Sequence, residues 1–215
     1  MPCKGVIFDV DGVLADTVPL HFTAWQRMFS EYGYTFNDEI YRQKVDGLPR
    51  QVGARNVMAD ADEATIQEAA DRKQSYFLEM MDQGLLKPLP GSIDFCQALR
   101  QQGIILAAAS SSVNASAILD SIHVLDLFNT VVTTADVARG KPYPDIFLTA
   151  AQRLNLSVGE CIVIEDAQSG IQAAKAGGFI CIGIDRHAQA QYFEQADAVV
   201  RDLLELDYET LSRLC

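Results

Sequence analysis

The chain has 215 residues, of which 49% are hydrophobic and 21% are charged, and its formal net charge is −12. The excess of 29 acidic over 17 basic residues disfavours nucleic acids and anionic membrane surfaces as partners, because both require a basic face. This is the composition of a folded globular protein, long enough for one large domain or for one domain with an insertion.

Apolar, strand-like segments alternate with helical segments along most of the chain. The strands that we expect are residues 4–9, 104–110, 130–134, 161–166 and 179–184, with a short one ending at Val200. Amphipathic helices are predicted at residues 92–102, 113–121, 145–154 and 168–176. The early strands are continuously apolar, as expected for parallel strands that are covered on both faces. The alternation predicts an α/β fold with a doubly wound, Rossmann-like parallel core sheet.

Residues 16–87 break this alternation, because they contain no strand pattern. The stretch "PLHFTAWQRMFSEYG" reads as a helix with an aromatic stripe of Phe22, Trp25, Phe29 and Tyr32, which we interpret as packing. The stretch "EATIQEAADRKQSYFLEMMDQG" reads as a second, longer helix. We therefore predict an all-helical cap domain at residues 16–87, inserted into a core domain made of residues 1–15 and 88–215.

The cysteines and the start of the chain point to a reducing compartment. The five cysteines are Cys3, Cys96, Cys161, Cys181 and Cys215, and no two of them have CxxC spacing. Cys161 and Cys181 fall in apolar strand-like runs. We expect buried thiols and no zinc site. The opening "MPCKGVIFD" becomes polar too soon for a signal peptide, and no apolar run is long enough to span a bilayer. These features favour a cytoplasmic protein.

Polar side chains gather at the predicted carboxyl ends of the strands. They are Asp9 and Asp11 after the first strand, Ser110 at the end of the second, Glu165 and Asp166 at the end of "CIVIED", and Lys141 on the loop before the helix that leads to that strand. Each acid alone would be read as a helix cap or a solvated loop end. Together they predict a site, because ligands of open α/β sheets bind at the carboxyl ends of the strands. Mg²⁺ suits such a set of oxygen ligands and would relieve the repulsion between the carboxylates.

The spacing of the first two aspartates suggests a chemistry. Residues i and i+2 leave a strand on the same side, so Asp9 can present a nucleophilic oxygen while Asp11 stands beside it as acid and base. A carboxylate that attacks phosphorus forms an aspartyl-phosphate and divides one transfer into two steps. Mg²⁺, Lys141, Ser110 and backbone N–H groups near Gly12 would hold the charge of the transferring group.

Taken in order, "DVDGV", Ser110, Lys141 followed by proline, and "IEDAQSG" resemble the four motifs of the haloacid dehalogenase superfamily of phosphotransferases. The resemblance covers the whole chain, including a helical cap inserted after the first motif. It implies that Asp9 is the nucleophile and Asp11 the general acid/base. It also implies that Mg²⁺ is held by Asp9, the Asp11 carbonyl and Asp166, with Glu165 close by or ligating. Aspartate at both positions of the first motif implies phosphoryl transfer rather than dehalogenation.

Within the superfamily, the likeness is greatest to the β-phosphoglucomutase family. The family stretch "DGV..DT....HF.AW" is matched by Asp11, Gly12, Val13, Asp16, Thr17, His21, Phe22, Ala24 and Trp25. The resemblance implies a phosphorylated sugar as substrate and places contacts to it at Thr17, His21, Trp25, Gly47, Arg50, Lys73, Ser112 and Asn114. Arg50 in "GLPRQ", with Ser112 and Asn114, would bind the phosphate that is not transferred.

Three positions depart from the family pattern. Asp46 and Val113 stand where the family has lysines, and Gly53 stands where it has a serine. The expected protein is therefore a cytoplasmic, monomeric, Mg²⁺-dependent enzyme with two candidate reactions. One is the interconversion of a β-hexose 1-phosphate and a hexose 6-phosphate, and the other is hydrolysis of small sugar phosphates.

Two further classes of protein fit less well. A phosphate-accepting signalling domain also has an acidic Mg²⁺ pocket and a lysine, but it would carry its phosphoacceptor on a middle strand and lack a cap. A sugar-phosphate binder without catalysis would be expected to lose its nucleophile, whereas Asp9 and Asp11 are both present.

Overall fold

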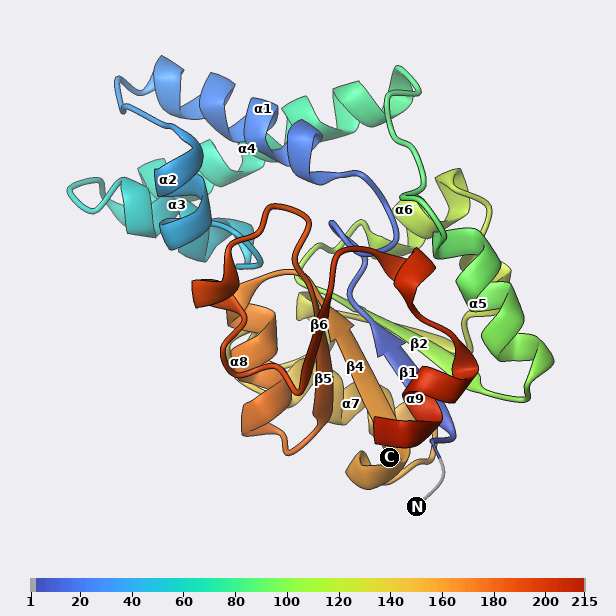
Figure 1. The fold of residues 1–215 in the computed structure, drawn as a ribbon. Coiled ribbons are helices and arrows are strands. Elements are labelled where there is room, and N and C mark those ends of the chain that lie inside the picture. The colour runs from blue at the N-terminus through green and yellow to red at the C-terminus, as the bar shows by residue number, and fades with distance from the viewer. Residues whose placement is uncertain (1–2, 215) are drawn as a thin grey trace.

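The computed structural model describes residues 3–214, which form a parallel sheet between two layers of helices with a further helical layer at one end (Figure 1). The strands are β1 (Gly5–Phe8), β2 (Ile105–Ser110), β3 (Thr130–Thr133), β4 (Cys161–Glu165), β5 (Ile180–Ile184) and β6 (Ala198–Val200). Their order across the sheet is β3-β2-β1-β4-β5-β6, and all neighbours are parallel. The predicted doubly wound α/β core is confirmed.

Both faces of the sheet are covered by helices. One face carries α5 (Ser92–Gln101), α6 (Ala115–Ser121) and α9 (Tyr208–Leu214), and the other carries α7 (Asp145–Arg153) and α8 (Gln168–Ala176). In β1, Val6 and Phe8 pack into the first layer while Ile7 packs into the second. This double burial explains why β1 is apolar throughout. Cys96, Cys161 and Cys181 are buried as predicted, and Cys215 lies outside the described residues.

The helical layer above the sheet consists of α1 (Val18–Glu31), α2 (Asp38–Lys44), α3 (Arg50–Val57) and α4 (Glu63–Asp82), shown from blue to green-cyan in Figure 1. We call these four helices the cap. The cap has a core of its own, in which Trp25 and Phe29 are buried and stacked at 5.2 Å between ring centres. The packing role predicted for the aromatic stripe is therefore confirmed.

The cap contains two helices that the sequence pattern did not predict. Helices α2 and α3 have only seven and eight residues, too few to show a clear apolar period. Helix α2 begins at a polar cap, because the Asn37 side chain accepts a hydrogen bond of 2.9 Å from the Ile40 N–H. Helix α3 begins at Arg50, so "GLPRQ" is a turn that leads into a helix rather than a free loop.

The two chain segments that join the cap to the core lie side by side. The Asp16 N–H donates to the Lys87 carbonyl at 2.8 Å, the Leu89 N–H donates to the Leu14 carbonyl at 2.9 Å, and Ala15 forms an antiparallel bridge with Pro88. The division into domains at residues 16–87 stays a prediction. Within residues 3–214, no helix is both long and apolar enough to cross a membrane.

Candidate active site

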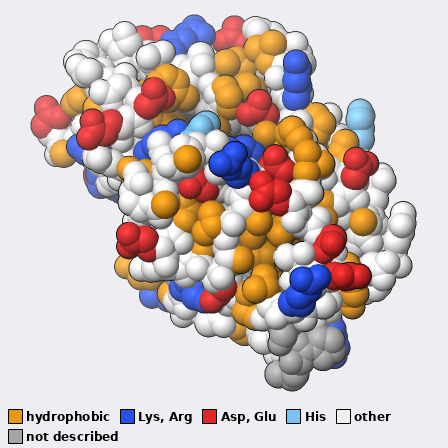
Figure 2. Space-filling model, viewed as in Figure 1, with side chains coloured by type: hydrophobic (Ala, Val, Ile, Leu, Met, Phe, Trp, Pro, Cys, Tyr) orange, Lys and Arg blue, Asp and Glu red, His pale blue; other side chains and the backbone are white. Residues whose placement is uncertain are grey.

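A cavity of about 340 Å³ lies between the carboxyl end of the sheet and the cap. It adjoins the central strands β1 and β4, where the strand order reverses and where ligands of such sheets bind. In Figure 2, acidic, basic and histidine side chains gather along the junction between the cap and the core. Ten of the predicted site residues line the cavity: Asp9, Asp11, His21, Trp25, Gly47, Arg50, Lys73, Ser112, Glu165 and Asp166.

Lys141 lies behind the cavity wall and joins two of the carboxylates. Its Nζ contacts Oδ1 of Asp9 and lies 2.5 Å from Oε1 of Glu165, and its side chain is almost fully buried. Burial alone would lower the pKa of Lys141, but the charges of Asp9 and Glu165 outweigh it and raise that pKa. Burial raises the pKa of Asp9, and Lys141 counteracts this rise. Lys141 thus supplies a fixed positive charge beside the candidate nucleophile.

Both oxygens of Glu165 are used within the protein. Oε1 accepts from Lys141, and Oε2 accepts from the Ala167 N–H at 2.6 Å. Gly170 allows this arrangement, because a Cβ at that position would lie 1.7 Å from Oε1. Glu165 therefore holds Lys141 in place, and the geometry favours Asp166 as the carboxylate that completes a metal site.

The donor set at the bottom of the cavity fits Mg²⁺. Burial raises the pKa of Asp166, and the nearby charges of Glu165, Asp46 and Asp9 raise it further, so a divalent cation would stabilise this group of acids. In residues 3–214, no three acidic, histidine or cysteine side chains are grouped to hold a metal by themselves. Mg²⁺ does not need such a cage, since it commonly takes one or two carboxylates and completes its shell with water and substrate phosphate.

Asp11 is the meeting point of the core and the cap. Its Oδ2 accepts from the Ser110 hydroxyl at 2.8 Å, and its Oδ1 lies 3.0 Å from Nε2 of His21 on α1. Burial would raise the pKa of Asp11, but the hydrogen bonds from His21 and Ser110 lower it. Asp11 is therefore held as a carboxylate.

His21 in turn contacts a second residue of the cap. Its Nδ1 lies 2.8 Å from Nζ of Lys73 on α4, and its ring stacks on Phe77 with 4.1 Å between the ring centres. Burial and the Lys73 charge lower the pKa of His21, so a neutral ring donates through Nε2 to Asp11 and accepts at Nδ1. Burial lowers the pKa of Lys73 to about 7. A continuous line of polar contacts therefore runs from Lys73 through His21 to Asp11.

Arg50 lines the cavity, and Asn114 lies beside it through its contacts with Gln74 and Ser112, which also line it. Nε of Arg50 and Nδ2 of Asn114 are buried and have no partner within the described part of the chain. The Asn114 side chain accepts from Gln74 of α4 at 2.9 Å, and its backbone N–H donates to the Ser112 hydroxyl at 3.2 Å. Arg50 makes one long contact, of 3.4 Å, with Asp71. Buried donors without partners are suited to an anion.

The turn before α3 docks on the core. The Gly47 carbonyl accepts from the Ser111 hydroxyl at 2.8 Å, and the Asp46 carbonyl lies 3.4 Å from the Ser169 hydroxyl. Gly47 has φ +67°, and a Cβ there would lie 2.5 Å from Oγ of Ser169 and 2.8 Å from Cβ of Ala167. The docking points the Asp46 side chain into the cavity, where burial and neighbouring acids raise its pKa to about 6.

Two of the predicted substrate contacts have surroundings of another kind. Thr17 is fully buried beside the first connecting segment, and its side chain helps to lower the pKa of Asp11. Trp25 is 3% exposed and belongs to the core of the cap, with Nζ of Lys73 5.0 Å from its ring centre.

Sequence reasoning did not identify several residues that the fold places at this site. Gln74, Ser111 and Ser169 link the cap to the core, and Arg186 reaches the Gly12 carbonyl. Gln74 follows Lys73 directly in the sequence, so its place at the site could have been predicted from that of Lys73. The other three carry no local signal, because their partners lie far away in the chain.

Comparison with known proteins agrees with the geometry. Residues 3–178 match the haloacid dehalogenase-like hydrolase family. The chain is 34% identical to the β-phosphoglucomutase of Bacillus subtilis (strain 168), over 97% of this chain and 93% of that protein. It is 31% identical to hexitol phosphatase A of Escherichia coli (strain K12), over 96% of this chain and 94% of that protein. A crystal structure of a β-phosphoglucomutase from Clostridium difficile has the same fold, with a TM-score of 0.90, 24% identity and coverage of 99% and 96%.

Proposed function

Because this chain belongs to the haloacid dehalogenase-like hydrolase family, as its motifs predicted, we propose that it transfers phosphoryl groups of sugar phosphates through Asp9. The observation that carries the proposal is the pairing of Asp9 with the buried Lys141 next to Asp11, whose carboxylate is held by the cap. We further propose that the reaction interconverts a β-hexose 1-phosphate and a hexose 6-phosphate.

The first half-reaction uses Asp9 as nucleophile. One of its carboxylate oxygens attacks the phosphorus, the P–O bond to the sugar breaks, and the sugar oxygen takes from Asp11 the proton that Asp11 gained from a sugar hydroxyl in the other half-reaction. Lys141 remains beside Asp9 and offsets the negative charge of the aspartyl-phosphate. When bound by Asp9, Asp166 and the Asp11 carbonyl, Mg²⁺ supplies further positive charge to the phosphoryl oxygens.

The second half-reaction reverses these roles. Asp11 takes the proton of a hydroxyl at the other end of the sugar, that oxygen attacks the phosphorus, and the P–O bond to Asp9 breaks. The hydrogen bonds from Ser110 and His21 keep Asp11 ionised, which suits it to begin as a base. An enzyme in which Asp11 is ionised begins its cycle with Asp9 already phosphorylated. We therefore expect turnover to need a sugar bisphosphate as primer.

The far end of the cavity would hold the phosphate that does not react. Arg50 and Ser112 line the cavity and Asn114 lies beside it; Nε of Arg50 and Nδ2 of Asn114 are buried and have no hydrogen-bond partner within residues 3–214. A sugar with a phosphate at each end could then bind in either direction, as an exchange between its two ends requires. The cap covers the reacting end and limits the access of water.

Hydrolysis is the second candidate, and two residues favour it. Asp46 adds a carboxylate to the cavity, and Val113, 47% exposed, contributes no charge near Ser112. A negative charge gained without a compensating cation weakens the binding of a bisphosphate. Water would then compete for the aspartyl-phosphate, and a phosphatase is among the relatives.

The test is to supply β-glucose 1-phosphate, Mg²⁺ and a glucose bisphosphate primer, and to follow glucose 6-phosphate and free phosphate together. The isomerase proposal expects glucose 6-phosphate to account for the substrate consumed. Free phosphate that rises in step with substrate loss, without glucose 6-phosphate, would refute the isomerase and support the phosphatase. The Val113→Lys variant should raise transfer relative to hydrolysis if the missing charge is the cause.

A further inference from the structure

Arg186 lies on a loop at the carboxyl end of β5, next to a residue that is hydrogen-bonded on several sides. The preceding residue, Asp185, is 9% exposed and accepts hydrogen bonds from the N–H groups of His187 at 3.2 Å and of Gln189 at 2.7 Å. The Asp185 N–H donates to the Val200 carbonyl at 2.8 Å. These bonds fix the start of the loop, so the Arg186 side chain leaves the sheet edge in a defined direction.

The Arg186 side chain extends to the loop that follows β1. Its Nη1 donates a hydrogen bond to the Gly12 carbonyl, directly after Asp11. On another side of Gly12 lies Asp166, whose Oδ2 is 1.9 Å from where a Cβ of residue 12 would be. Arg186 and Asp166 thus converge on one glycine, whose φ of +77° and missing side chain make room for both.

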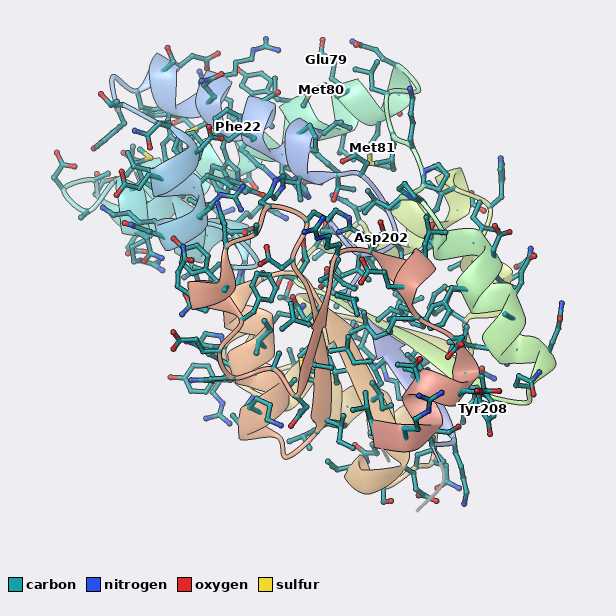
Figure 3. The ribbon with its side chains drawn as sticks, in the orientation of Figure 1. Phe22, Glu79, Met80, Met81, Asp202 and Tyr208 are labelled. Carbon is teal, nitrogen blue, oxygen red and sulfur yellow. The ribbon has the colours of Figure 1, made fainter. Side chains whose placement is uncertain are left out.

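The charges that face Arg186 are acidic. Asp166, Asp202 and Asp16 act on its guanidinium, and Figure 3 labels Asp202 on the segment that follows β6. A second, smaller cavity of about 90 Å³ borders Gly12, Asp166 and Arg186. Nη2 of Arg186 is buried and has no hydrogen-bond partner within residues 3–214. The guanidinium is therefore bonded to the loop through one nitrogen while its charge acts on Asp166.

We propose that Arg186 is a positioning residue for the cation site, a fixed positive charge behind Asp166 that substitutes in part for Mg²⁺ when Mg²⁺ is absent. It keeps Asp166 and the Gly12 loop in place against the repulsion of the acids. The same charge opposes the incoming cation, so Arg186 makes Mg²⁺ binding weaker and more readily reversible. The proposal rests on the proposed function only in taking Asp166 as a ligand of the cation.

The test compares Arg186→Gln and Arg186→Lys with wild type by calorimetric titration of Mg²⁺ without substrate, and by thermal unfolding with EDTA or with saturating Mg²⁺. For Arg186→Gln we expect Mg²⁺ to bind about three- to tenfold more tightly, from one charge several ångströms away at a high effective dielectric constant. Its unfolding temperature should fall in EDTA and rise further on adding Mg²⁺ than that of wild type. Arg186→Lys, which keeps the charge, should stay close to wild type.

Two controls keep the outcomes distinct. Arg213→Gln removes the same charge from α9, where Arg213 is 73% exposed and pairs with Glu209, and should leave Mg²⁺ binding unchanged. Asp166→Asn should abolish Mg²⁺ binding; if it does not, the metal site of the proposed function is wrong. Weaker or unchanged Mg²⁺ binding in Arg186→Gln would overturn the proposed role of Arg186. If Arg186 only supported the Gly12 loop, Mg²⁺ binding should weaken in both Arg186→Gln and Arg186→Lys.

Discussion

The cap places the carboxylate of Asp46 close to the acidic residues of the core. Removing this negative charge should stabilise the metal-free protein. Burial and the charges of Glu165 and Asp11 raise the pKa of Asp46 from 3.8 to about 6. Since an ordinary aspartate in the unfolded chain holds its proton less tightly, the folded state binds more protons between these two values, and stability falls as the pH rises through them. Above pH 6 the full cost is present, and Asp46→Asn removes it.

The size of the effect follows from the same rise. Each pH unit corresponds to about 1.4 kcal/mol, so a rise of roughly two units sets an upper limit of about 3 kcal/mol. Asp46 is partly exposed, and solvent screens its charge, so we expect about 1–1.5 kcal/mol. For a chain of this length that corresponds to an increase of roughly 2–6 °C in the unfolding temperature at pH 7.5.

Thermal unfolding in EDTA at pH 5 and pH 7.5 would measure this effect. At pH 5 the gain from Asp46→Asn should be roughly half of that at pH 7.5, because part of the cost has not yet developed there. Saturating Mg²⁺ should reduce the gain at either pH. Asp126→Asn, which removes an exposed carboxylate of the core, is the matched control. A gain that is equal at both pH values, or a loss of stability at pH 7.5, would refute the reasoning and with it the docked position of Asp46.

Three other changes test the chemistry and the cap. Asp9→Asn, and EDTA on the wild type, should each abolish turnover, and a variant that keeps a tenth of the wild-type rate would exclude an aspartyl-phosphate. Because burial lowers the pKa of Lys73 to about 7, Lys73 loses its positive charge as the pH rises through that value, and the rate should fall. The Lys73→Arg variant should remain active at higher pH. A pH–rate profile that is the same in both proteins would contradict a role for this charge. We expect small-angle scattering to show compaction when the cap closes over Mg²⁺, a phosphate mimic and a sugar phosphate. Gly47→Ala should raise the KM and weaken this compaction, since its Cβ would meet Ser169 at 2.5 Å. Gly84→Ala, with φ +71° and nothing within 4 Å, carries the same backbone cost and should leave both measurements unchanged.

The sheet and the reacting end of the cavity were predictable because their signals are local. An apolar run such as β1 is buried on both faces, and the acids at its end mark the edge where ligands bind. The short helices α2 and α3 lacked such a signal, since they are stabilised mainly by packing into the core of the cap.

The connections between distant parts of the chain were beyond sequence reasoning. Lys73 and His21 are 52 residues apart, and Arg186 and Gly12 are 174 apart. Only the docking of the cap shows that His21 reaches Asp11, and only the sheet order brings the end of β5 close to the loop after β1. The residue type of Arg186 did not indicate this contact either, because an isolated arginine after a strand is usually exposed to solvent.

The paired connecting segments have a mechanical consequence. A body attached to another at two adjacent, hydrogen-bonded strips is free to swing about them, but sliding sideways would break the bonds between Asp16 and Lys87 and between Leu14 and Leu89. We therefore expect the cap to move by a hinge rotation about the two connecting segments. Residues next to the pivot, such as His21 in the first turn of α1, would move least, and the turn between α2 and α3, which contains Gly47, would move farther. The mouth would then open at the Gly47 side, while the contact between His21 and Asp11 is the last to separate.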